Sequence, residues 1–395
     1  MADKREVVIV GAARTPIGAY GGSLKDFTAC DLGAHVVKAA FARAGVDAKE
    51  AQHLVFGNVI HTEARDMYVS RVVALNAGMA QESCAMGVNR LCGSGFQAIV
   101  SAANAIQLGD AECAVGGGVE TMSRGGYLMP AARWGARMND TKMIDMMVGA
   151  LTDPFETTHM GITAENIASQ FGFGREEQDA FAVESHRRAA AATDAGHFKS
   201  QIAPLEVQTK KGTTVIDTDE HFRRDATVEG MAKLRPVFKK DGSVTAGNAS
   251  GINDGAAAIV MMEAGAAARA GAKPLARLVS YAVAGVAPSI MGTGPIPAVK
   301  LALARAGLKA SDLDVIESNE AFAVQAMCVT RELGLDPAKV NVNGGAVGLG
   351  HPVGATGAVL TVKCLYELQR TGGRYGLITM CIGGGQGIAG IIERI

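Results

Sequence analysis

The chain has 395 residues, of which 48% are hydrophobic and 19% are charged, and its formal net charge is −1. This length provides two or three domains' worth of packed structure, and the composition is that of a folded globular protein rather than a disordered chain. A net charge so close to zero excludes a general electrostatic attraction to nucleic acid or to anionic membranes. Any anionic ligand must therefore be bound by a local patch.

Three features of the sequence indicate where in the cell the protein acts: the first residues, the apolar runs and the cysteines. Residues 1–16 read as a strand and a loop rather than as a targeting segment, and no apolar run is long enough to span a bilayer. The seven cysteines are odd in number and lack metal-ligand spacing. We therefore expect a cytoplasmic protein with reduced thiols, without a bound metal and without a membrane partner.

Apolar runs alternate with alanine-rich stretches along the first third of the chain. The sequence predicts strands over residues 7–12, 53–60 and 112–117 and helices over 31–45 and 95–108. Such alternation is typical of α/β layers around a mostly buried sheet.

The last third of the chain repeats part of the first. A shift of 262 positions places residues 37–48 on 299–310 with eight identities, and each copy continues into an apolar strand. Alanine-rich helices can resemble one another by chance, but chance does not reproduce the order of the following elements. We infer a duplication, with an N-terminal half of residues 1–121 and 253–273 and a C-terminal half of residues 274–395.

Residues 122–252 differ in character from both halves. They contain the only tryptophan, two charged segments predicted to be helical (163–170 and 175–195) and a basic stretch over 223–240. We interpret this region as an inserted domain that carries specificity, although most lysines of the basic stretch fit an ordinary solvated surface equally well.

Cys92 follows an extended segment, in NRLCGSGFQA, and stands at the start of a predicted helix. A helix N-terminus favours negative charge, so the sequence predicts a thiolate with a lowered pKa. The glycines on either side of Ser94 would let a substrate approach the backbone. A cysteine in a reduced protein is more often an inert core residue, and both interpretations stay open here.

Two polar residues stand out in the C-terminal half. Asn319 follows the predicted strand 315–318, where asparagine usually forms a turn and can alternatively orient a water. His351, in GGAVGLGHPVGATG, opens a predicted helix at the repeat position that corresponds to Cys92. A pseudo-twofold packing of the halves would bring this imidazole to the cysteine, as activation of a nucleophile requires. A buried structural histidine is the alternative.

Cys381 ends the predicted strand 375–380, ahead of three glycines. It could be a core cysteine at a strand end. The glycines alternatively free several backbone N–H groups, which suits an oxyanion hole for a thioester. The segment lacks the last glycine of a dinucleotide-binding fingerprint and the chain has no Walker sequence, so NAD and ATP are disfavoured.

Taken together, NRLCGSG, NEAFA, GGAVGLGHPVGATG and CIGGGQG resemble the thiolase family in order and spacing, from one end of the chain to the other. The closest likeness is to bacterial biosynthetic acetyl-CoA acetyltransferases and broad-range β-ketothiolases. The resemblance implies an α/β fold of two duplicated βαβαβαββ halves in a five-layer α-β-α-β-α stack with an inserted loop domain. It also implies a reversible Claisen condensation of two acyl-CoA to 3-ketoacyl-CoA and CoA, in ping-pong order through an acyl-cysteine.

The resemblance assigns catalytic roles residue by residue. Cys92 would carry the acyl group as a thioester, and His351 would activate it. His351 would also bind a thioester oxygen together with a water held by Asn319. Cys381 would remove the α-proton of the second acetyl-CoA. The backbone N–H groups of Cys92 and Gly383 would form the other oxyanion hole.

The resemblance also places the CoA thioester against the insertion, as a substrate, with no separate cofactor. The segment HMGITAEN resembles a loop on the pantetheine side, although His159 could equally cap the helix that follows. Arg223 resembles the residue that meets the adenine end of CoA. Residues expected to bind CoA or the substrate are Leu151, His159, Met160, Arg223, Phe238, Ser250, Met291, Ala321 and Phe322.

Some positions depart from the pattern of the family. Phe96 stands where leucine is more usual, and its bulk is expected to shift the acyl-chain preference. Gly348 stands where relatives commonly have alanine, and Thr356 where they often have serine. These small exchanges bear on CoA affinity more than on the chemistry.

The expected partners are acetyl-CoA, acetoacetyl-CoA and CoA. We also expect a homo-oligomer, most simply a tetramer, because the apolar, arginine-bearing segment 126–140 resembles the loop through which members of the family form tetramers. The implied setting is fatty acid metabolism or polyhydroxyalkanoate biosynthesis. Condensation and cleavage use the same residues, so the physiological direction cannot be inferred from the motifs.

Three alternative functions follow from the same motifs. One is a longer-chain 3-ketoacyl-CoA thiolase of β-oxidation. A decarboxylating ketoacyl synthase of the same fold is disfavoured, because the chain has one motif histidine and a second motif cysteine. A non-catalytic acyl-CoA or lipid carrier should have lost at least one of Cys92, His351 and Cys381, and all three are present.

Overall fold

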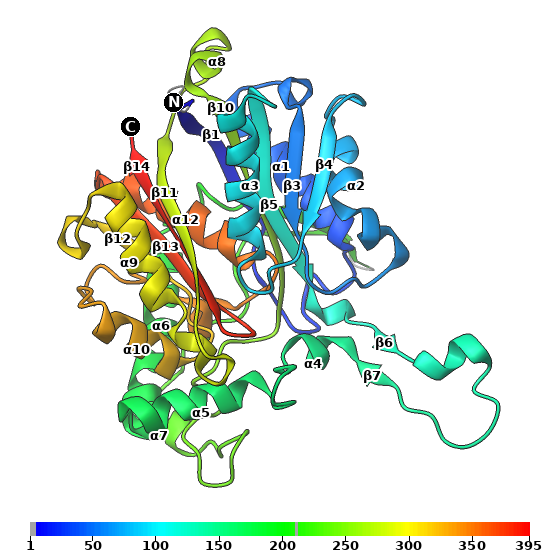
Figure 1. The fold of residues 1–395 in the computed structure, drawn as a ribbon, viewed down its shortest axis with the longest axis vertical. Coiled ribbons are helices and arrows are strands. Elements are labelled where there is room, and N and C mark those ends of the chain that lie inside the picture. The colour runs from blue at the N-terminus through cyan, green and yellow to red at the C-terminus, as the bar shows by residue number, and fades with distance from the viewer. Residues whose placement is uncertain (1–4, 210–211) are drawn as a thin grey trace.

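The strands of the first third of the chain pair with a strand from beyond the insertion and form the sheet of the N-terminal half (Figure 1). The computed structural model describes residues 5–209 and 212–395. The first three strands of this sheet run parallel, and the last two pairings are antiparallel. In order across the sheet they are β4 (Cys84–Val88), β3 (His53–Gly57), β5 (Cys113–Thr121), β10 (Asn253–Glu263) and β1 (Val7–Arg14).

The C-terminal half repeats this arrangement. Its first pairing is parallel and the next two are antiparallel. At the outer edge, a parallel bridge between Ile316 and Val340 takes the place of the fifth strand. The strands in order are β12 (Val315–Ser318), β13 (Tyr375–Ile382), β14 (Gln386–Arg394) and β11 (Ala276–Gly285).

The two sheets join along one edge, and helices form three further layers. β1 and β11 pair only through Val8 with Arg277 and Ile9 with Ala276. Two helices cover the outer face of the first sheet, two lie between the sheets, and one covers the outer face of the second. This order confirms the five-layer α-β-α-β-α stack. The helices are, in that order, α1 (Ala29–Ala44) and α2 (Val69–Asn76), α3 (Ser94–Leu108) and α12 (Thr356–Thr371), and α9 (Pro295–Ala306).

The repeated sequence corresponds to equivalent helix ends. Gly45 follows α1 with a φ of 66°, and Gly307 follows α9 with a φ of 67°. Glycine adopts this left-handed conformation without steric cost, so it ends a helix cleanly. Each helix then leads through a short turn to the next strand of its own half, β3 or β12.

The insertion contributes two long helices and a projecting arm. Its charged segments form α5 (Met160–Phe171) and α6 (Arg175–Asp194). The arm begins and ends at a short ladder between β6 (Tyr127–Leu128) and β7 (Ile144–Asp145) and extends away from the body of the protein (Figure 1). The remaining elements are β2 (Gly18–Ala19), β8 (Leu205–Thr209), β9 (Gly212–Ile216), α4 (Met146–Ala150), α7 (Val228–Ala232), α8 (Ala264–Arg269), α10 (Ala323–Glu332) and α11 (Ala346–Leu349).

The two central helices begin against each other. A Cβ atom on Gly95 would lie 2.8 Å from the backbone N of Ala358, and one on Gly357 would overlap the backbone N of Phe96. Only glycine allows this approach, so the starts of α3 and α12 converge as the repeat predicted. The expectation that His351 opens α12 is wrong, since that helix begins at Thr356.

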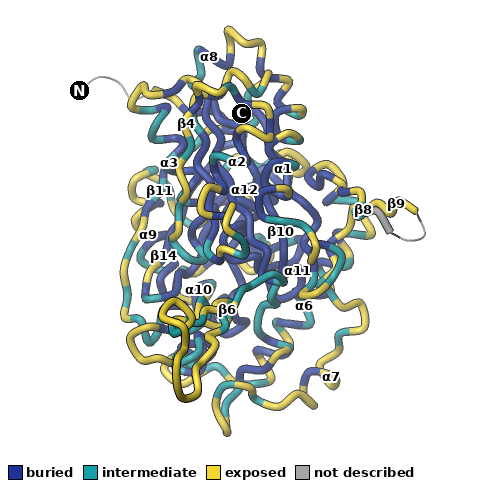
Figure 2. Tube along the Cα trace, turned by 90° about the vertical axis from the view of Figure 1, so that its right-hand side faces the viewer, coloured by how far each residue is buried: buried dark blue, intermediate teal, exposed yellow. Residues whose placement is uncertain are grey.

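Burial follows the layers. Apolar side chains of both sheets and of α3 and α12 form one continuous core, and the arm is exposed along its length (Figure 2). Two further apolar clusters lie under α1 and α9, on the outer faces of the sheets. None of the helices within residues 5–209 and 212–395 combines the length and the apolar character needed to cross a membrane.

Candidate active site

A cavity of about 500 Å3 opens where the insertion meets both halves of the chain. Cys92, His351 and Gly383 line it. Asn319 and Cys381 do not reach its surface, because both side chains are fully buried. All nine residues that the sequence predicted to bind CoA or the substrate line the same cavity, namely Leu151, His159, Met160, Arg223, Phe238, Ser250, Met291, Ala321 and Phe322.

A tight turn between β4 and α3 presents Cys92 to the cavity. Leu91 has a φ of 45°, a conformation that bulky residues rarely adopt. The Ser94 hydroxyl stabilises the turn from inside, because it accepts a hydrogen bond from Arg90 N (2.8 Å) and donates one to Leu91 O (2.7 Å). A residue held in such a conformation at a cavity is a mark of a functional turn.

The Cys92 thiol is protonated at neutral pH in the free protein. Burial raises its pKa to about 11, although the backbone N–H groups of Gly383 and of Cys92 itself act in the opposite direction. The prediction of a lowered pKa is therefore wrong. Cys92 stands two residues ahead of α3, and burial outweighs the effect of that helix end. A thiol in this state needs a base before it can attack a thioester.

His351 lines the same cavity and is the candidate base that the sequence motifs indicate. Its Nδ1 lies 2.6 Å from Thr356 Oγ1, and its Nε2 lies 3.4 Å from Asn319 Nδ2. The backbone N–H of His351 donates to Asn253 Oδ1 at 3.0 Å, which fixes the position of the residue. Burial lowers the pKa of the imidazole to about 4. His351 is therefore neutral at pH 7, and Nε2 is the nitrogen left to accept a proton.

Cys381 lies behind the cavity wall, in an apolar cluster with Met160 and Met291. Burial, with a further contribution from the nearby Cys92, raises its pKa well above the ordinary value of a thiol. The backbone after it turns through Gly384 and Gly385, with φ of 82° and 88°. This turn brings the N–H of Gly383 to the Cys92 sulfur. The two cysteines and the glycine-rich turn thus form one cluster.

His159 fulfils both of the roles considered for it. Its Nδ1 accepts a hydrogen bond from Gly161 N (3.0 Å) and so caps α5. Its ring also lines the cavity and stacks on Phe238, with the ring centroids 4.5 Å apart, while Phe238 meets Phe322 edge-on at 6.2 Å. A Cβ on Gly161 would overlap the Phe238 ring. Glycine at 161 is therefore needed for this aromatic wall.

Phe96 does not contribute to the cavity. Its side chain is fully buried in the core between the sheets, with the ring against Gly390. The ring faces the core and is not among the residues that line the site, so its bulk has no direct contact with the cavity. A shift of the acyl-chain preference through Phe96 stays a prediction.

Sequence reasoning missed several residues that hold or line the site. Glu120, at the end of β5, is fully buried and accepts hydrogen bonds from Val59 N, Ile60 N and Asn58 Nδ2 at 3.0–3.1 Å and from Gly354 N at 2.8 Å. It therefore ties the loop after β3 to the segment that carries His351. The sequence feature that could have identified Glu120 is a carboxylate at the end of a glycine-rich strand. The cavity-lining Tyr20 and His221 lie in no motif.

Two family models match almost the whole chain. The model described as "Thiolase, N-terminal domain" matches residues 7–265, and the model described as "Thiolase, C-terminal domain" matches residues 272–394. The boundary between the matches falls just ahead of β11, the first strand of the C-terminal half.

Individual proteins are also similar over their whole length. The chain is 63% identical to beta-ketothiolase BktB of Cupriavidus necator, over 99% of this chain and 100% of that protein. It is 51% identical to an acetyl-CoA acetyltransferase of Syntrophomonas wolfei, again over 99% and 100%. The crystal structure of human mitochondrial 3-ketoacyl-CoA thiolase in complex with CoA matches with a TM-score of 0.96 at 46% identity, over 99% of this chain and 98% of that one.

Proposed function

This chain belongs to the thiolase family and is an acyltransferase, and we propose that it is an acetyl-CoA C-acetyltransferase acting through Cys92. The reaction is the reversible condensation of two acyl-CoA molecules to 3-ketoacyl-CoA and CoA. The observation that carries this proposal is the single cavity that joins Cys92, His351 and the Gly383 backbone to the residues predicted to bind CoA.

In the first half-reaction, Cys92 attacks the thioester carbonyl of one acyl-CoA. Its thiol has a pKa of about 11, so the attack depends on transfer of the proton to Nε2 of His351, which burial keeps neutral. The departing CoA sulfur takes its proton from the Cys381 thiol, and the proton from Cys92 stays on Nε2 of His351. The N–H groups of Cys92 and Gly383 converge near the Cys92 sulfur, where they stabilise the oxyanion of the tetrahedral intermediate.

In the second half-reaction, Cys381, now the thiolate left by the first half-reaction, takes the α-proton from acetyl-CoA, and the resulting carbanion attacks the acyl group on Cys92 and displaces the Cys92 sulfur. The protonated Nε2 of His351 and a water held by Asn319 donate hydrogen bonds to the oxygen of the enolate, and Nε2 returns its proton to the Cys92 sulfur when that sulfur departs. Cys381 has a strongly raised pKa, so its resting form is the thiol. That is the form required in the direction of cleavage, where Cys381 returns a proton to the carbon of the departing enolate.

The walls of the cavity favour a short acyl group. Met291, Phe322 and Met160 are buried side chains that line the cavity and pack in one apolar cluster with Cys381. We infer that acetyl-CoA is the main substrate and that propionyl-CoA is also accepted. CoA extends past Phe238 and Ser250 towards Arg223, and no other cofactor is required.

The biological setting is part of the proposal. A reversible condensation of short acyl-CoA supplies the chemistry that polyhydroxyalkanoate or fatty acid metabolism needs, and we propose that the enzyme serves one of them. We place the enzyme in the cytoplasm. We also propose a homotetramer, a dimer of dimers assembled through the projecting arm, whose Trp134 and Met138 side chains are 81% and 85% exposed in the single chain.

The test of this function is thiolysis of acetoacetyl-CoA by free CoA, beside 3-ketovaleryl-CoA and 3-ketohexanoyl-CoA, with Cys92→Ala as the control. We expect rapid cleavage of the four-carbon substrate, slower cleavage of the six-carbon substrate, and no cleavage by the variant. Preference for the six-carbon substrate would favour the longer-chain thiolase. A folded wild-type protein that cleaves none of the three would favour a carrier of acyl-CoA.

A further inference from the structure

Asn319 must face His351, yet its own side chain contributes little to holding it there. Apart from the 3.4 Å approach of Nδ2 to His351 Nε2, the buried Oδ1 atom has no partner within the described residues. The backbone N of Asn319 donates to Thr379 O at 2.9 Å, which fixes one side of the residue. The orientation of Asn319 therefore depends on its chain neighbours, Ser318 and Glu320.

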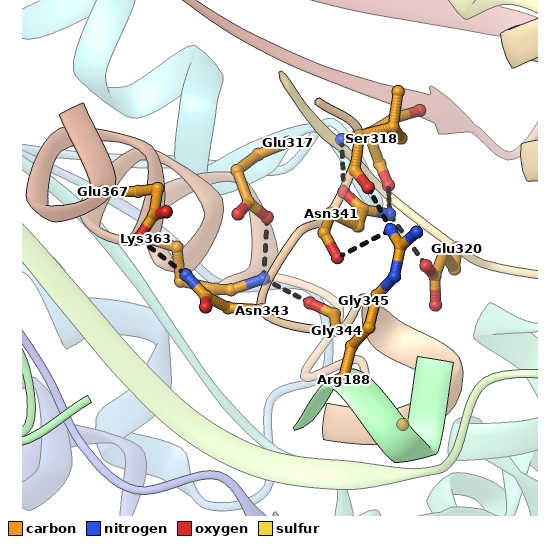
Figure 3. Close-up of polar contacts among 12 residues, drawn as sticks. Arg188, Glu317, Ser318, Glu320, Asn341, Asn343, Gly344, Gly345, Lys363 and Glu367 are labelled. Atoms are coloured by element: carbon orange, nitrogen blue, oxygen red, sulfur yellow. Dashed lines mark hydrogen bonds and ion pairs between the residues drawn. The ribbon is translucent and has the colours of Figure 1, made fainter. Parts of the chain in front are cut away.

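Asn341 holds both of these neighbours (Figure 3). Its Oδ1 accepts a hydrogen bond from Ser318 N (2.9 Å), and its Nδ2 donates to Ser318 O (2.7 Å) and to Glu320 Oε1 (2.8 Å). The backbone N of Asn341 also donates to Ile316 O at 2.8 Å. The side-chain amide thus continues the ladder alongside β12 for one more residue, as a peptide of an edge strand would.

The backbone of Asn341 adopts a strained conformation that the contacts of its side chain must offset. Its φ is 46°, and its side chain is 2% exposed. Asparagine tolerates this left-handed conformation better than most residues, at a cost that other contacts must offset. Here three side-chain hydrogen bonds offset it, and all three go to the two residues that flank Asn319.

The same amide is linked to the segment that carries His351. The carboxylate of Glu320 accepts from Ser185 Oγ (2.6 Å) and from Val347 N (3.1 Å), in addition to Asn341. Ser185 Oγ in turn accepts from Gly345 N (3.2 Å) and Gly348 N (3.1 Å). These glycines and Val347 lie in and beside α11, directly before His351. One buried network therefore joins the two loops of the site.

We propose that Asn341 is a positioning residue, which sets Asn319 against His351 by clamping Ser318 and Glu320. This inference rests on the proposed function, because Asn319 and His351 act together on the enolate oxygen there. Asn341 itself does not line the cavity and touches no substrate. Its effect on catalysis passes through the position of Asn319 relative to His351.

The main variant is Asn341→Asp, which keeps the shape but loses both Nδ2 donors and sets a carboxylate against Ser318 O and Glu320. Asn341→Gly is the second variant, because glycine accepts a φ of 46° without strain and removes the clamp alone. The matched control is Asn343→Asp. Asn343 lies on the same loop and is also buried, but its Nδ2 donates to Glu367 Oε2 (2.8 Å), away from Asn319 (Figure 3).

We expect both Asn341 variants to lower kcat for thiolysis of acetoacetyl-CoA by up to about 100-fold, the scale of a misplacement of about 1 Å. KM for CoA should stay within about twofold, since the CoA wall is untouched, and Asn343→Asp should retain wild-type kcat. In an Asn319→Ala background, Asn341→Gly should cause no further loss, because its effect passes through Asn319. Losses that multiply in the double variant would overturn the proposal.

A crystal structure of each Asn341 variant gives a readout that does not depend on activity. The distance from Asn319 Nδ2 to His351 Nε2, 3.4 Å in the wild type, should increase in both Asn341 variants and stay unchanged in Asn343→Asp. An unchanged distance in both Asn341 variants would refute the positioning role. Failure of the wild type to cleave any 3-ketoacyl-CoA would instead refute the proposed function, while this distance would still decide the role of Asn341.

Discussion

Cys92 and His351, the proposed nucleophile and base, are both expected to be neutral before substrate binds. Burial raises the pKa of Cys92 to about 11 and lowers that of His351 to about 4, so burial opposes charge on both. A preformed thiolate and imidazolium pair would lose hydration on both sides. The proton therefore moves during the attack itself, when the N–H groups of Gly383 and Cys92 can stabilise the developing oxyanion.

This state of His351 predicts an unusual pH dependence. A histidine with an ordinary pKa would lose its basic form as the pH falls through about 6.5. His351, with a pKa of about 4, should remain basic, so the rate of Cys92 acetylation by acetyl-CoA should show no decline near pH 6.5. Rapid-quench measurements between pH 8 and pH 5 test this, with recovery of activity at pH 8 as the control for unfolding. A decline centred near pH 6.5 would contradict the buried imidazole.

The same shift acts on stability with a defined sign. Between pH 6.5 and 4 the unfolded chain binds a proton at His351 that the native chain does not, so this group makes the native state less stable as the pH falls through that range. His186, whose pKa burial also lowers to about 4, adds to the effect in the same direction. Activity at pH 5 therefore has to be measured within the time in which the protein stays folded.

At the scale of elements, one buried ion pair attaches the insertion to β1. Arg14, at the end of β1, donates from its two terminal nitrogens to both carboxylate oxygens of Asp219 at 2.7 and 2.9 Å, and both side chains are fully buried. Asp219 also accepts from Ile17 N at 2.8 Å. It stands two residues before the cavity-lining His221, so the pair fixes one wall of the site.

We predict that Asp219→Asn destabilises the protein by about 3–5 kcal/mol, because it leaves the Arg14 guanidinium buried without its counter-charge. Thermal unfolding should show a fall in Tm of several degrees. The control is Asp194→Asn, which breaks the surface pair with Arg224, where both side chains are more than half exposed. This control should not change Tm measurably. Equal effects of the two variants would contradict the role of the buried pair.

Elements with a strong local signal could be predicted from the sequence. The strand expected over residues 315–318 forms as β12 over those residues, and the helix expected over 95–108 forms as α3 from Ser94 to Leu108. The start of α12 could not be predicted, because tertiary contacts set it. Asn253 and Glu120 hold the backbone N–H groups of His351 and Gly354, and the helix can begin only after them.

The site residues that lie in sequence motifs could be predicted. The repeat placed Cys92 and His351 at equivalent positions, and both line one cavity. The direction of the shift in the Cys92 pKa could not be predicted from the sequence. A helix start can be recognised in the sequence, but the depth of burial cannot. Supporting residues such as Asn341 and Glu120 act through hydrogen bonds between distant segments. No spacing of residues in the sequence predicts those hydrogen bonds.

At the scale of the whole molecule, the arm is the most conspicuous feature without a role inside the single chain. It extends from the β6–β7 ladder away from the body of the protein (Figure 1). Its apolar side chains are exposed to solvent. Exposed apolar groups gathered on one projecting segment mark a surface for association. The segment is far from the core of either half, so disrupting it should leave the fold of the single chain intact.

We predict that Trp134→Asp combined with Met138→Asp converts tetramers into dimers, as measured by light scattering, with thiolysis by each chain retained. Leu108→Asp serves as the control, because Leu108 is a comparably exposed apolar residue (79%) on a different surface. An unchanged mass for the arm variant, or a wild-type mass below that of four chains, would refute assembly through the arm.

The division of the site between the two halves has a consequence for the order of events during synthesis and folding. Cys92 leaves the ribosome when more than half of the chain, including β10 and His351, is still unmade. The N-terminal sheet cannot close without β10, and the nucleophile has no base until the second half docks beside α3. The pairing of Cys92 with His351 therefore forms only when the two halves have docked. Thiolysis activity should accordingly recover late during refolding. Its time course would then report the rate at which the two halves dock.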